Sequence, residues 1–308
     1  MIWIWIGVIA VFAAAALYAS DWAVWGRSRR PHWHRRRHRH WPHHDALPGD
    51  GISLLVPFLT DNSHRERNWK WLRRYWSYVL PGAELIVSPN HDRPFNKCRA
   101  VNMAFRHSTG DVIVIMDADA YLPAESILEC AARVRADRRL WFIPYRHMYR
   151  LTKAATTILT DLSPDGPMLL KNPPPRGLWI DEGGSSSGHW FGALMQVMPR
   201  EAFESVGGMD ERFAGWGGED VSFMRAVDTL YGRHKTFNGP AFHLWHSSVK
   251  VARNASDLET IRAARYREKR WQGQPRAVMN AGLTTRYAEA FMDIERMQAL
   301  VDERRDLR

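Results

Sequence analysis

The residues of this chain best suited to chemistry lie in two short acidic runs. The first, Asp117-Ala118-Asp119, directly follows the apolar run from Asp111 to Met116. Because residues two apart in an extended segment point the same way, Asp117 and Asp119 can converge on one target. Carboxylate oxygens suit Mg²⁺ and Mn²⁺, and a metal ion held there could clamp a diphosphate. The alternative is a pair of solvated turn residues or helix caps.

The second run, Glu219-Asp220, follows Trp216-Gly217-Gly218 and opens an apolar series at helical spacing. That series is Val221, Met224, Val227 and Leu230. It predicts a helix that begins near Glu219. Carboxylates in a first helical turn are stabilised by the helix dipole, which alone would explain the two acids. Capping does not explain the tryptophan and the glycines, and a tryptophan face suits a sugar ring, so this segment is a candidate site.

Two histidines, His243 and His246, are candidates to join the first acidic run. Neutral imidazole is a good ligand for a borderline divalent ion, so the pair could complete a coordination begun by Asp119. Residues three apart in a straight strand face opposite ways, so both can bind one ion only if the chain turns there. The alternative for each is a buried histidine bonded to the backbone.

The elements that must position these residues alternate between strands and helices. The expected order is a strand at 52–58, a helix over 69–79, a strand at 84–88, a helix over 96–105 and a strand at 111–116. This alternation predicts an α/β fold with a mostly parallel central sheet flanked by helices. In such sheets ligands bind beyond the carboxyl ends of the strands, where Asp117-Ala118-Asp119 falls.

The second half of the chain is less regular. Residues 161–188 are rich in Pro, Gly and Ser, which predicts either a mobile loop near the mouth of the site, a candidate lid, or a disordered insertion. Strands are expected at 140–145 and 189–197. After Ser256 the sequence is helical and charged, and the apolar stripe of its last helix fits core packing, self-association or contact with a membrane.

The composition allows a folded domain and excludes a disulfide scaffold. The chain has 308 residues, of which 45% are hydrophobic, enough for a large core. Its two cysteines are too few for a disulfide framework and favour a reducing compartment. The net charge of +10 comes mostly from seven arginines between Arg27 and Arg39. A general nucleic-acid-binding surface is therefore not indicated, and a nucleic-acid partner is unlikely.

The amino-terminal segment predicts a single-pass membrane protein. Residues 1–19 carry no charged side chain, and roughly 20 apolar residues can span a hydrocarbon layer of ~30 Å. A cleaved signal peptide is the alternative, although its positive amino end is missing. The arginine and histidine block that follows favours a cytoplasmic catalytic part and contact with membrane lipid. The histidines between His32 and His44 leave a metal-binding tract open.

These features divide the chain into four parts. We expect a transmembrane anchor at 1–20, a basic Arg/His-rich linker at 21–49, a catalytic domain at 50–254 and a carboxyl-terminal helical extension at 255–308.

From about Ile52 to Ser248 the chain resembles the glycosyltransferases of the GT-A fold, and most closely the β-1,4-galactosyltransferase and chondroitin-polymerase-like groups. The matching motifs are Val56-Pro57-Phe58, Phe95-Asn96-Lys97 with Asn102 and Phe105, Asp117-Ala118-Asp119, Phe191-Gly192, Gly207-Gly208-Met209-Asp210 and Trp216-Gly217-Gly218-Glu219-Asp220. The last is the most specific. The resemblance implies a Rossmann-like GT-A domain and a hexosyltransferase that moves a hexose or N-acetylhexosamine from a UDP-sugar to a hydroxyl of a glycan or another acceptor.

The resemblance also implies roles for individual residues. The donor nucleotide would be bound by Pro57, Phe58, Arg65, Phe95, Asn96, Lys97, Asp117 and Ala118. Mn²⁺, or Mg²⁺, would be held by Asp119, Asp117, His246 and His243. The acceptor sugar would be bound by Trp216, Gly217, Gly218 and Glu219. Asp220 would be the general base of an inverting transfer, with Glu219 as the second catalytic carboxylate.

Two departures from the family and several alternatives stay open. Val221-Ser222 stand where the galactosyltransferases continue with acids, and His243 stands where they have methionine. Retaining transferases carry a related Trp-Gly-Gly-Glu motif. A non-catalytic, membrane-tethered carbohydrate-binding module on the same fold is the main alternative to an enzyme, and a membrane-associated nucleic-acid binder ranks last.

Overall fold

The computed structural model describes residues 47–60, 63–89, 92, 95–165, 170, 172–183, 194–215, 217–247 and 275–305. The predicted transmembrane segment and most of the basic linker lie outside these ranges, as do Trp216 and Phe191-Gly192. Among the helices in the described ranges, none is both long and apolar enough to cross a bilayer. The described part falls within one compact unit, Leu47–Arg308.

The main sheet of the described residues has six strands in the order β2-β1-β3-β8-β5-β9. These strands are β1 (Ile52–Phe58), β2 (Glu84–Pro89), β3 (Val112–Met116), β5 (Phe142–Ile143), β8 (Met195–Pro199) and β9 (Lys235–Thr236). The buried strand β1 pairs in parallel with both β2 and β3, as the sequence predicts. Strand β8 runs antiparallel to β3 and to β5, and β5 pairs in parallel with β9. Only β8 therefore runs against the other five strands of this sheet, and the prediction of a mostly parallel sheet is confirmed.

A second sheet, which the sequence did not reveal, has the order β4-β10-β6-β7 within the described ranges. Its strands are β4 (Ala120–Tyr121), β6 (His147–Leu151), β7 (Trp179–Gly183) and β10 (Pro240–His243). Strand β10 lies between β4 and β6, and its register places His243 opposite Ala120. Strand β7 occupies part of the segment 161–188, which is therefore not one continuous loop. Residues 166–169, 171 and 184–188 of the predicted lid lie outside the described residues.

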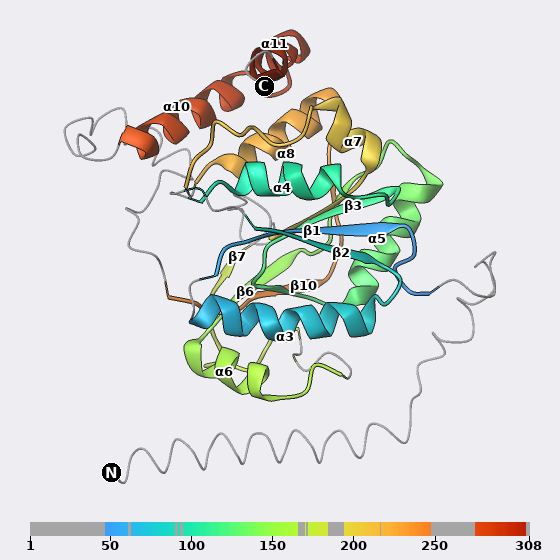
Figure 1. The fold of residues 1–308 in the computed structure, drawn as a ribbon, viewed down its shortest axis with the longest axis vertical. Helices are drawn as coiled ribbons and strands as arrows, with labels where there is room; N and C mark the ends of the chain where they lie inside the picture. Colours follow the sequence, from blue (N-terminus) through green and yellow to red (C-terminus); the bar gives the residue numbers. More distant parts are fainter. Residues whose placement is uncertain are drawn as a thin grey trace. The chain divides into compact units, whose positions relative to one another are not determined.

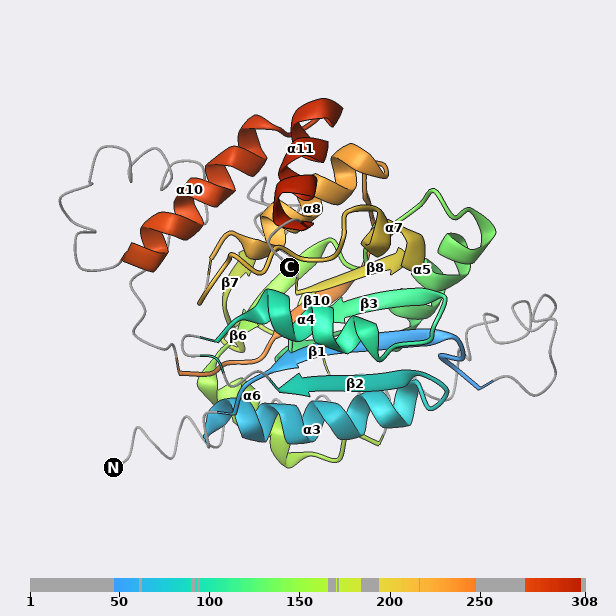
Figure 2. The same cartoon turned by 45° about the horizontal axis from the view of Figure 1, so that its top comes forward.

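Helices cover both faces of the main sheet. They are α3 (His64–Val79), α4 (Lys97–Arg106), α5 (Ala124–Ala136), α6 (Lys153–Asp161), α7 (Arg200–Ser205), α8 (Glu219–Leu230), α10 (Pro275–Glu289) and α11 (Ile294–Arg305). Helices α4 and α3 flank β1 and β2 from opposite sides, and α10 and α11 lie against α8 (Figures 1 and 2). On the face of the sheet that α3 covers, aromatic side chains of this helix form much of the core, and Trp71 and Tyr75 contact Tyr121 edge-on.

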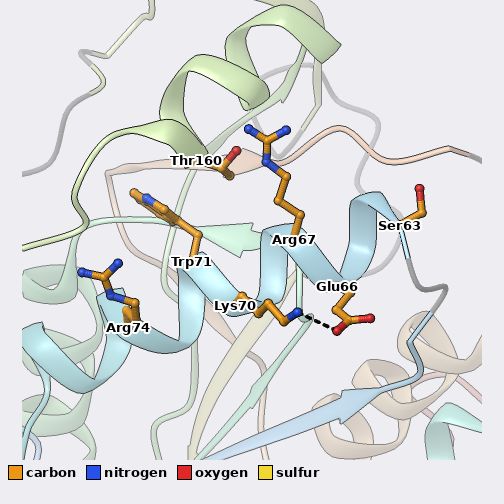
Figure 3. Close-up of a pocket in the computed structure, with 7 residues that line it drawn as sticks. All are labelled: Ser63, Glu66, Arg67, Lys70, Trp71, Arg74 and Thr160. Carbon is orange, nitrogen blue, oxygen red and sulfur yellow. Dashed lines mark ion pairs between the residues drawn. The ribbon is translucent and has the colours of Figure 1, made fainter.

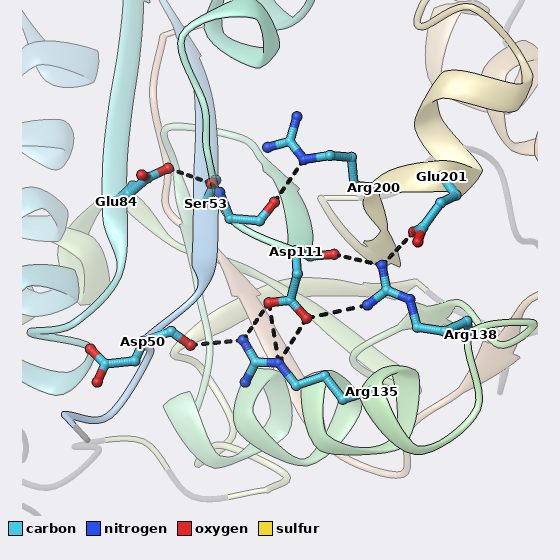
Figure 4. A network of polar contacts seen from close by, with 9 residues as sticks. Asp50, Ser53, Glu84, Asp111, Arg135, Arg138, Arg200 and Glu201 are labelled. Carbon is cyan, nitrogen blue, oxygen red and sulfur yellow. Dashed lines mark hydrogen bonds and ion pairs between the residues drawn. The ribbon is translucent and has the colours of Figure 1, made fainter. Parts of the chain in front are cut away.

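A polar network ties the amino ends of β1 and β3 to α5 and α7 (Figure 4). The carboxylate of Asp111 accepts hydrogen bonds from Arg135, 2.8 Å from its Nη2, and from Arg138, 3.2 Å from its Nη1. Arg138 also pairs with Glu201 at the start of α7. This network lies at the end of the strands opposite to Asp117, so we assign it to holding the sheet and its helices together.

Candidate functional site

The two aspartates after β3 lie in a turn and have different partners. The N–H of Asp117 donates to the C=O of Leu194 (2.9 Å), and its C=O accepts from the N–H of Ala120 (3.1 Å), which closes the turn. The segment is therefore not extended, and the expectation that both carboxylates point the same way is wrong in this respect. The carboxylate of Asp119 faces two histidines, whereas that of Asp117 faces Lys97.

Asp119, His243 and His246 form a compact group of potential metal ligands. One ligand atom from each lies within 4.8 Å of the others. Asp119 Oδ2 is 3.2 Å from His246 Nε2 and 3.8 Å from His243 Nε2. The pairing of β10 with β4 brings His243 to this place, and the chain then leaves the strand, as the sequence requires for both histidines to meet one ion.

Three hydrogen bonds hold the segment after β10 in this conformation. The N–H of Leu244 donates to the C=O of Asp119 (2.9 Å). The N–H of Trp245 donates to Thr156 Oγ1 (2.8 Å), and its C=O accepts from Asn68 Nδ2 (3.0 Å). These contacts to α6 and α3 fix the backbone next to His246, so the position of its ring depends on both helices.

The carboxylate and one imidazole of this group are in the ionisation states that metal binding needs, whereas, despite burial, Asp119 raises the pKa of His246. Burial would raise the pKa of Asp119, but His243, His246 and Arg65 hold it well below its usual range. Burial lowers the pKa of His243, which keeps its imidazole neutral and able to bind a metal. Asp119 Oδ1 is buried and has no hydrogen-bond partner among the residues that the structure describes. One carboxylate, two imidazoles and a buried oxygen in need of a partner fit a divalent metal ion.

Lys97 joins the two acidic runs. As the first residue of α4, it places its Nζ 2.6 Å from Asp117 Oδ1 and 2.8 Å from Asp220 Oδ1. Burial would lower the pKa of Lys97, but the carboxylates of Asp117, Asp220 and Glu219 outweigh it and hold the pKa well above the usual value. The ammonium group is thus charged and bridges two carboxylates that lie about a hundred residues apart in the sequence.

The two acids at the start of α8 have different environments. Glu219 is buried, and its Oε2 accepts a hydrogen bond from the N–H of Gly217 (2.8 Å), so its carboxylate folds back onto its own loop. Asp220 points to Lys97 instead. Burial raises the pKa of Asp220 to about 7, with Glu219 and Asp117 acting in the same direction and Lys97 opposing them.

Other predicted donor residues lie at the end of β1, at the start of α3 and in the turn after β3. Pro57 is buried near the end of β1, and the Phe58 ring lies 5.9 Å from that of Trp69. Arg65 Nη2 lies 3.5 Å from His246 Nε2. The half-buried Ala118 lies in the turn after β3.

Phe95 and Asn96 hold other parts of the protein. The C=O of Phe95 accepts from the N–H of Gly215 (3.0 Å). The side chain of Asn96 caps α4 by accepting from the N–H of Arg99 (2.9 Å), and it donates to the C=O of Glu211 (2.8 Å). Because both ends of its amide are engaged, Asn96 positions Lys97 and the loop before α8.

A separate open cavity of about 470 Å³ lies between α3 and α6 (Figure 3). It is lined by Ser63, Glu66, Arg67, Lys70, Trp71, Arg74 and Thr160. Its cations are paired with acids: Arg67 with Asp161 (2.5 Å), Lys70 with Glu66 (2.8 Å) and Arg74 with Asp165 (3.2 Å). None of the residues predicted to do chemistry lines this cavity, so we do not assign it to the site.

Comparison with known proteins identifies two matching families. Residues 58–178 match glycosyl transferase family 2, and residues 185–233 match a family described as the N-terminal domain of galactosyltransferase. The chain is thus similar to glycosyltransferases over these two stretches. The first match contains the Asp117–Asp119 turn and Lys97, and the second contains the start of α8.

Individual relatives are distant. Mouse chondroitin sulfate N-acetylgalactosaminyltransferase 2 is 29% identical over 160 residues, which are 50% of this chain and 27% of that protein. This chain therefore spans about a quarter of the length of the curated relative.

Two solved structures of a Drosophila enzyme are also similar. The catalytic domain of β-1,4-galactosyltransferase 7 with xylobiose has a TM-score of 0.40 and 17% identity, over 70% of this chain and 79% of that chain. A mutant of the same enzyme with manganese, UDP-Gal and xylobiose has a TM-score of 0.38 and 18% identity, over 64% and 71% of the two chains.

The sequence did not reveal the contribution of the last helices to this site. Asn280 and Thr284 of α10 contact the loop before α8. The sequence did contain an indication of this contribution, because asparagine and threonine are poor helix formers and both occur inside an otherwise helical stretch.

Proposed function

We propose that this chain is a membrane-anchored, metal-dependent glycosyltransferase that moves a hexose or N-acetylhexosamine from a UDP-sugar to a hydroxyl acceptor. The observation that carries the proposal is the half-buried group of Asp119, His243 and His246 beside the Lys97 bridge between Asp117 and Asp220. In a chain similar to glycosyltransferases, such an arrangement provides a metal site and a candidate base next to each other.

Asp119, His243 and His246 would hold the metal ion, with Asp117 as a further candidate ligand. A divalent ion bound there supplies Lewis-acid stabilisation of the negative charge that develops on the leaving diphosphate. Two imidazoles among three ligands favour Mn²⁺ over Mg²⁺, which prefers oxygen ligands. The guanidinium of Arg65, next to His246, adds positive charge on the same side.

The nucleotide would lie over the carboxyl ends of β1 and β3, against Pro57, Phe58, Phe95 and Ala118. Asn96 would act there indirectly, through the position that it gives to Lys97.

Asp220 would act as the general base that removes the proton of the acceptor hydroxyl. A carboxyl group with a pKa of about 7 is well matched to this task near neutral pH, and general base catalysis contributes ~10²–10⁴ to the rate. A single attack on the side opposite to the leaving group would invert the anomeric centre. The Trp-Gly-Gly-Glu motif leaves a retaining reaction as the alternative outcome.

Trp216, Gly217, Gly218 and Glu219 would form the acceptor side. The hydrogen bond from Gly217 to Glu219 supports a positioning role for Glu219, in which its carboxylate shapes the loop before α8.

The donor sugar is best sought first among N-acetylhexosamines. The name of the mouse relative specifies transfer of N-acetylgalactosamine in chondroitin sulfate synthesis. Stabilisation of the full-length chain against thermal unfolding by UDP-N-acetylgalactosamine, UDP-N-acetylglucosamine, UDP-galactose and UDP-glucose, with and without Mn²⁺, tests donor binding. We expect a Mn²⁺-dependent increase in Tm for at least one of them, and glycan binding that needs neither metal nor nucleotide would instead indicate a carbohydrate-binding module.

We also propose that residues 1–20 anchor the chain in a membrane, with the catalytic part in the cytoplasm. The proposal rests on the uncharged segment and the basic block after it. Protease treatment of intact cells and of permeabilised cells tests it: the catalytic part should be cut only after permeabilisation, and cleavage in intact cells would contradict the orientation.

A further inference from the structure

We infer that Asn280 of α10 is a positioning residue for the loop between Phe213 and Gly218, and that through this loop α10 determines how tightly the acceptor is held. The effect on acceptor binding rests on the proposed function, whereas the positioning of the loop by Asn280 does not. Both matched families end before α10, the second at residue 233.

The side chain of Asn280 contacts the loop at two points. Its Nδ2 donates to the C=O of Ala214 (3.0 Å), and its Oδ1 accepts from the N–H of the same residue (3.3 Å). Asn280 is buried, with 3% of its surface exposed. An amide that pairs with both polar groups of one residue fixes the position and the rotation of that backbone segment.

On the other side, the same loop is attached to the donor half of the site. The N–H of Gly215 donates to the C=O of Phe95 (3.0 Å), and Phe95 precedes Lys97 by two residues. The N–H of Gly217 donates to Glu219 Oε2 (2.8 Å). The loop is thus held between the donor side, the start of α8 and Asn280.

Helix α10 also approaches both ends of the loop. A Cβ atom on Gly218 would lie 2.0 Å from Thr284 Oγ1, and Thr284 is itself bonded to the C=O of Asn280 (2.7 Å). Before the loop, Asp210 Oδ2 accepts from the hydroxyl of Tyr287 (2.9 Å). Three side chains on successive turns of α10 therefore face the segment from Asp210 to Gly218.

A role in core packing alone would explain why Asn280 is buried, but not why both ends of its amide are hydrogen-bonded to Ala214. Leu283 on the same helix, and Ala290 just after it, already supply apolar packing. Asparagine disfavours a helix interior, and an aliphatic side chain would add to the core without a cost in polar burial. The two hydrogen bonds to Ala214 are what Asn280 adds, and they act on the loop that leads to Glu219 and Asp220.

The first test measures the loop itself in the full-length chain by amide hydrogen exchange, comparing wild type with Asn280→Ala and Asn280→Asp. The aspartate can accept from the N–H of Ala214, but its second oxygen faces the C=O of that residue, so it should raise the exchange rates at least as much as the alanine. We expect faster exchange at Gly215 and Gly217 in Asn280→Ala, although their own acceptors, Phe95 and Glu219, are unchanged. Faster exchange confined to Ala214 would overturn the inference.

Thr285→Ala is the matched control. Thr285 is half-buried on the same helix, and its hydroxyl bonds to the C=O of Ala281 within α10 (3.0 Å). This variant should leave the exchange rates of Gly215 and Gly217 as they are in wild type. If it raises them as much as Asn280→Ala does, the effect belongs to the helix in general and not to Asn280.

The second test measures kinetics with UDP-N-acetylgalactosamine and a chondroitin oligosaccharide. We expect the acceptor KM of Asn280→Ala to rise about tenfold, or ~1.4 kcal/mol, with the donor KM changed less than twofold. Equal increases in both constants, or a lower Tm with unchanged KM values, would contradict acceptor positioning. A wild-type chain that shows no transfer with any of the four UDP-sugars, together with the predicted exchange pattern, would refute the proposed function and leave the positioning of the loop supported.

Discussion

Lys97 is the single residue on which both halves of the site depend. Its ammonium group lies within 2.8 Å of carboxylates from the turn after β3 and from the start of α8. Without it, Asp117 and Asp220 would be two half-buried carboxylates with no cation between them. The position of Asp220 is therefore controlled by a residue that the sequence assigned only to nucleotide binding.

Replacing Lys97 with methionine is expected to reduce kcat by about 10²-fold or more at pH 7, because the pKa of Asp220 rises further and less of it is ionised. The loss should shrink as the pH is raised. Lys97→Arg keeps a cation at this position and is the control, with a smaller loss. Equal rates in wild type and Lys97→Met at pH 7 would remove Lys97 from this role.

The pKa of Asp220 predicts how activity depends on pH. A base must be deprotonated, and burial raises this pKa to about 7, so kcat/KM should rise from pH 6 to pH 8 and level off above that range. Asp220→Asn should remove this rise and lower the rate while leaving UDP-sugar binding intact. A pH profile of wild type that is flat across this range would contradict the assignment of Asp220 as base.

His246 should be a direct determinant of metal affinity. Its Nε2 lies 3.2 Å from Asp119 Oδ2, so removing the ring takes away one of three ligands. We expect His246→Ala to weaken Mn²⁺ binding at least tenfold, because mutations at metal sites typically lower metal affinity by about that factor or more. Isothermal titration calorimetry with Mn²⁺ and no sugar measures this affinity. His147→Ala is the control, since His147 pairs with Glu182 (2.8 Å) outside this group. An unchanged Mn²⁺ affinity in His246→Ala would exclude this site.

At the scale of elements, contact between α10 and the start of α8 predicts a difference between two glycines. Gly218 and Gly177 both have positive φ, at 87° and 89°. A Cβ atom added to Gly218 would lie 2.0 Å from Thr284 Oγ1, whereas a Cβ atom added to Gly177 would have no neighbour within 4 Å. Gly177→Ala should therefore cost ~1 kcal/mol in the free energy of unfolding, from backbone strain alone.

Gly218→Ala should cost more, about 2–4 kcal/mol, because it adds a clash to the same strain. Thr284→Ala in combination should recover much of the difference, which chemical denaturation of the single and double variants measures. Equal losses for the two glycine variants would mean that α10 does not pack against Gly218 in solution.

Some secondary-structure elements could be predicted from the sequence and others could not. The strand, helix, strand, helix, strand order from β1 to β3 was predicted to within a few residues at most ends, because it depends on local apolar periodicity and turn residues. The second sheet was not predicted, since β4 has two residues and β10 has four, and each pairs with a distant segment. Its register decides that His243 lies opposite Ala120, and so next to Asp119.

At the scale of the whole molecule, the sequence predicted the candidate residues better than their arrangement. Asp119, His243 and His246 were expected to share an ion and do lie together. The separate partners of Asp117 and Asp119 were not expected, because they follow from a turn closed by a backbone hydrogen bond. The role of Asn280 was not predicted: a polar residue inside a helical stretch indicates a contact, but its partner is a loop some 66 residues earlier in the chain.

The central claim is metal-dependent transfer of a sugar, and the mass of the acceptor after reaction tests it most directly. Full-length wild type would be incubated with UDP-N-acetylgalactosamine, UDP-N-acetylglucosamine, UDP-galactose or UDP-glucose and a chondroitin oligosaccharide, with and without Mn²⁺, beside Asp119→Asn. We expect an oligosaccharide heavier by one sugar for at least one donor, only with Mn²⁺, and little or none with Asp119→Asn. Product that forms equally without metal and in Asp119→Asn, or no product with any donor, would contradict this claim.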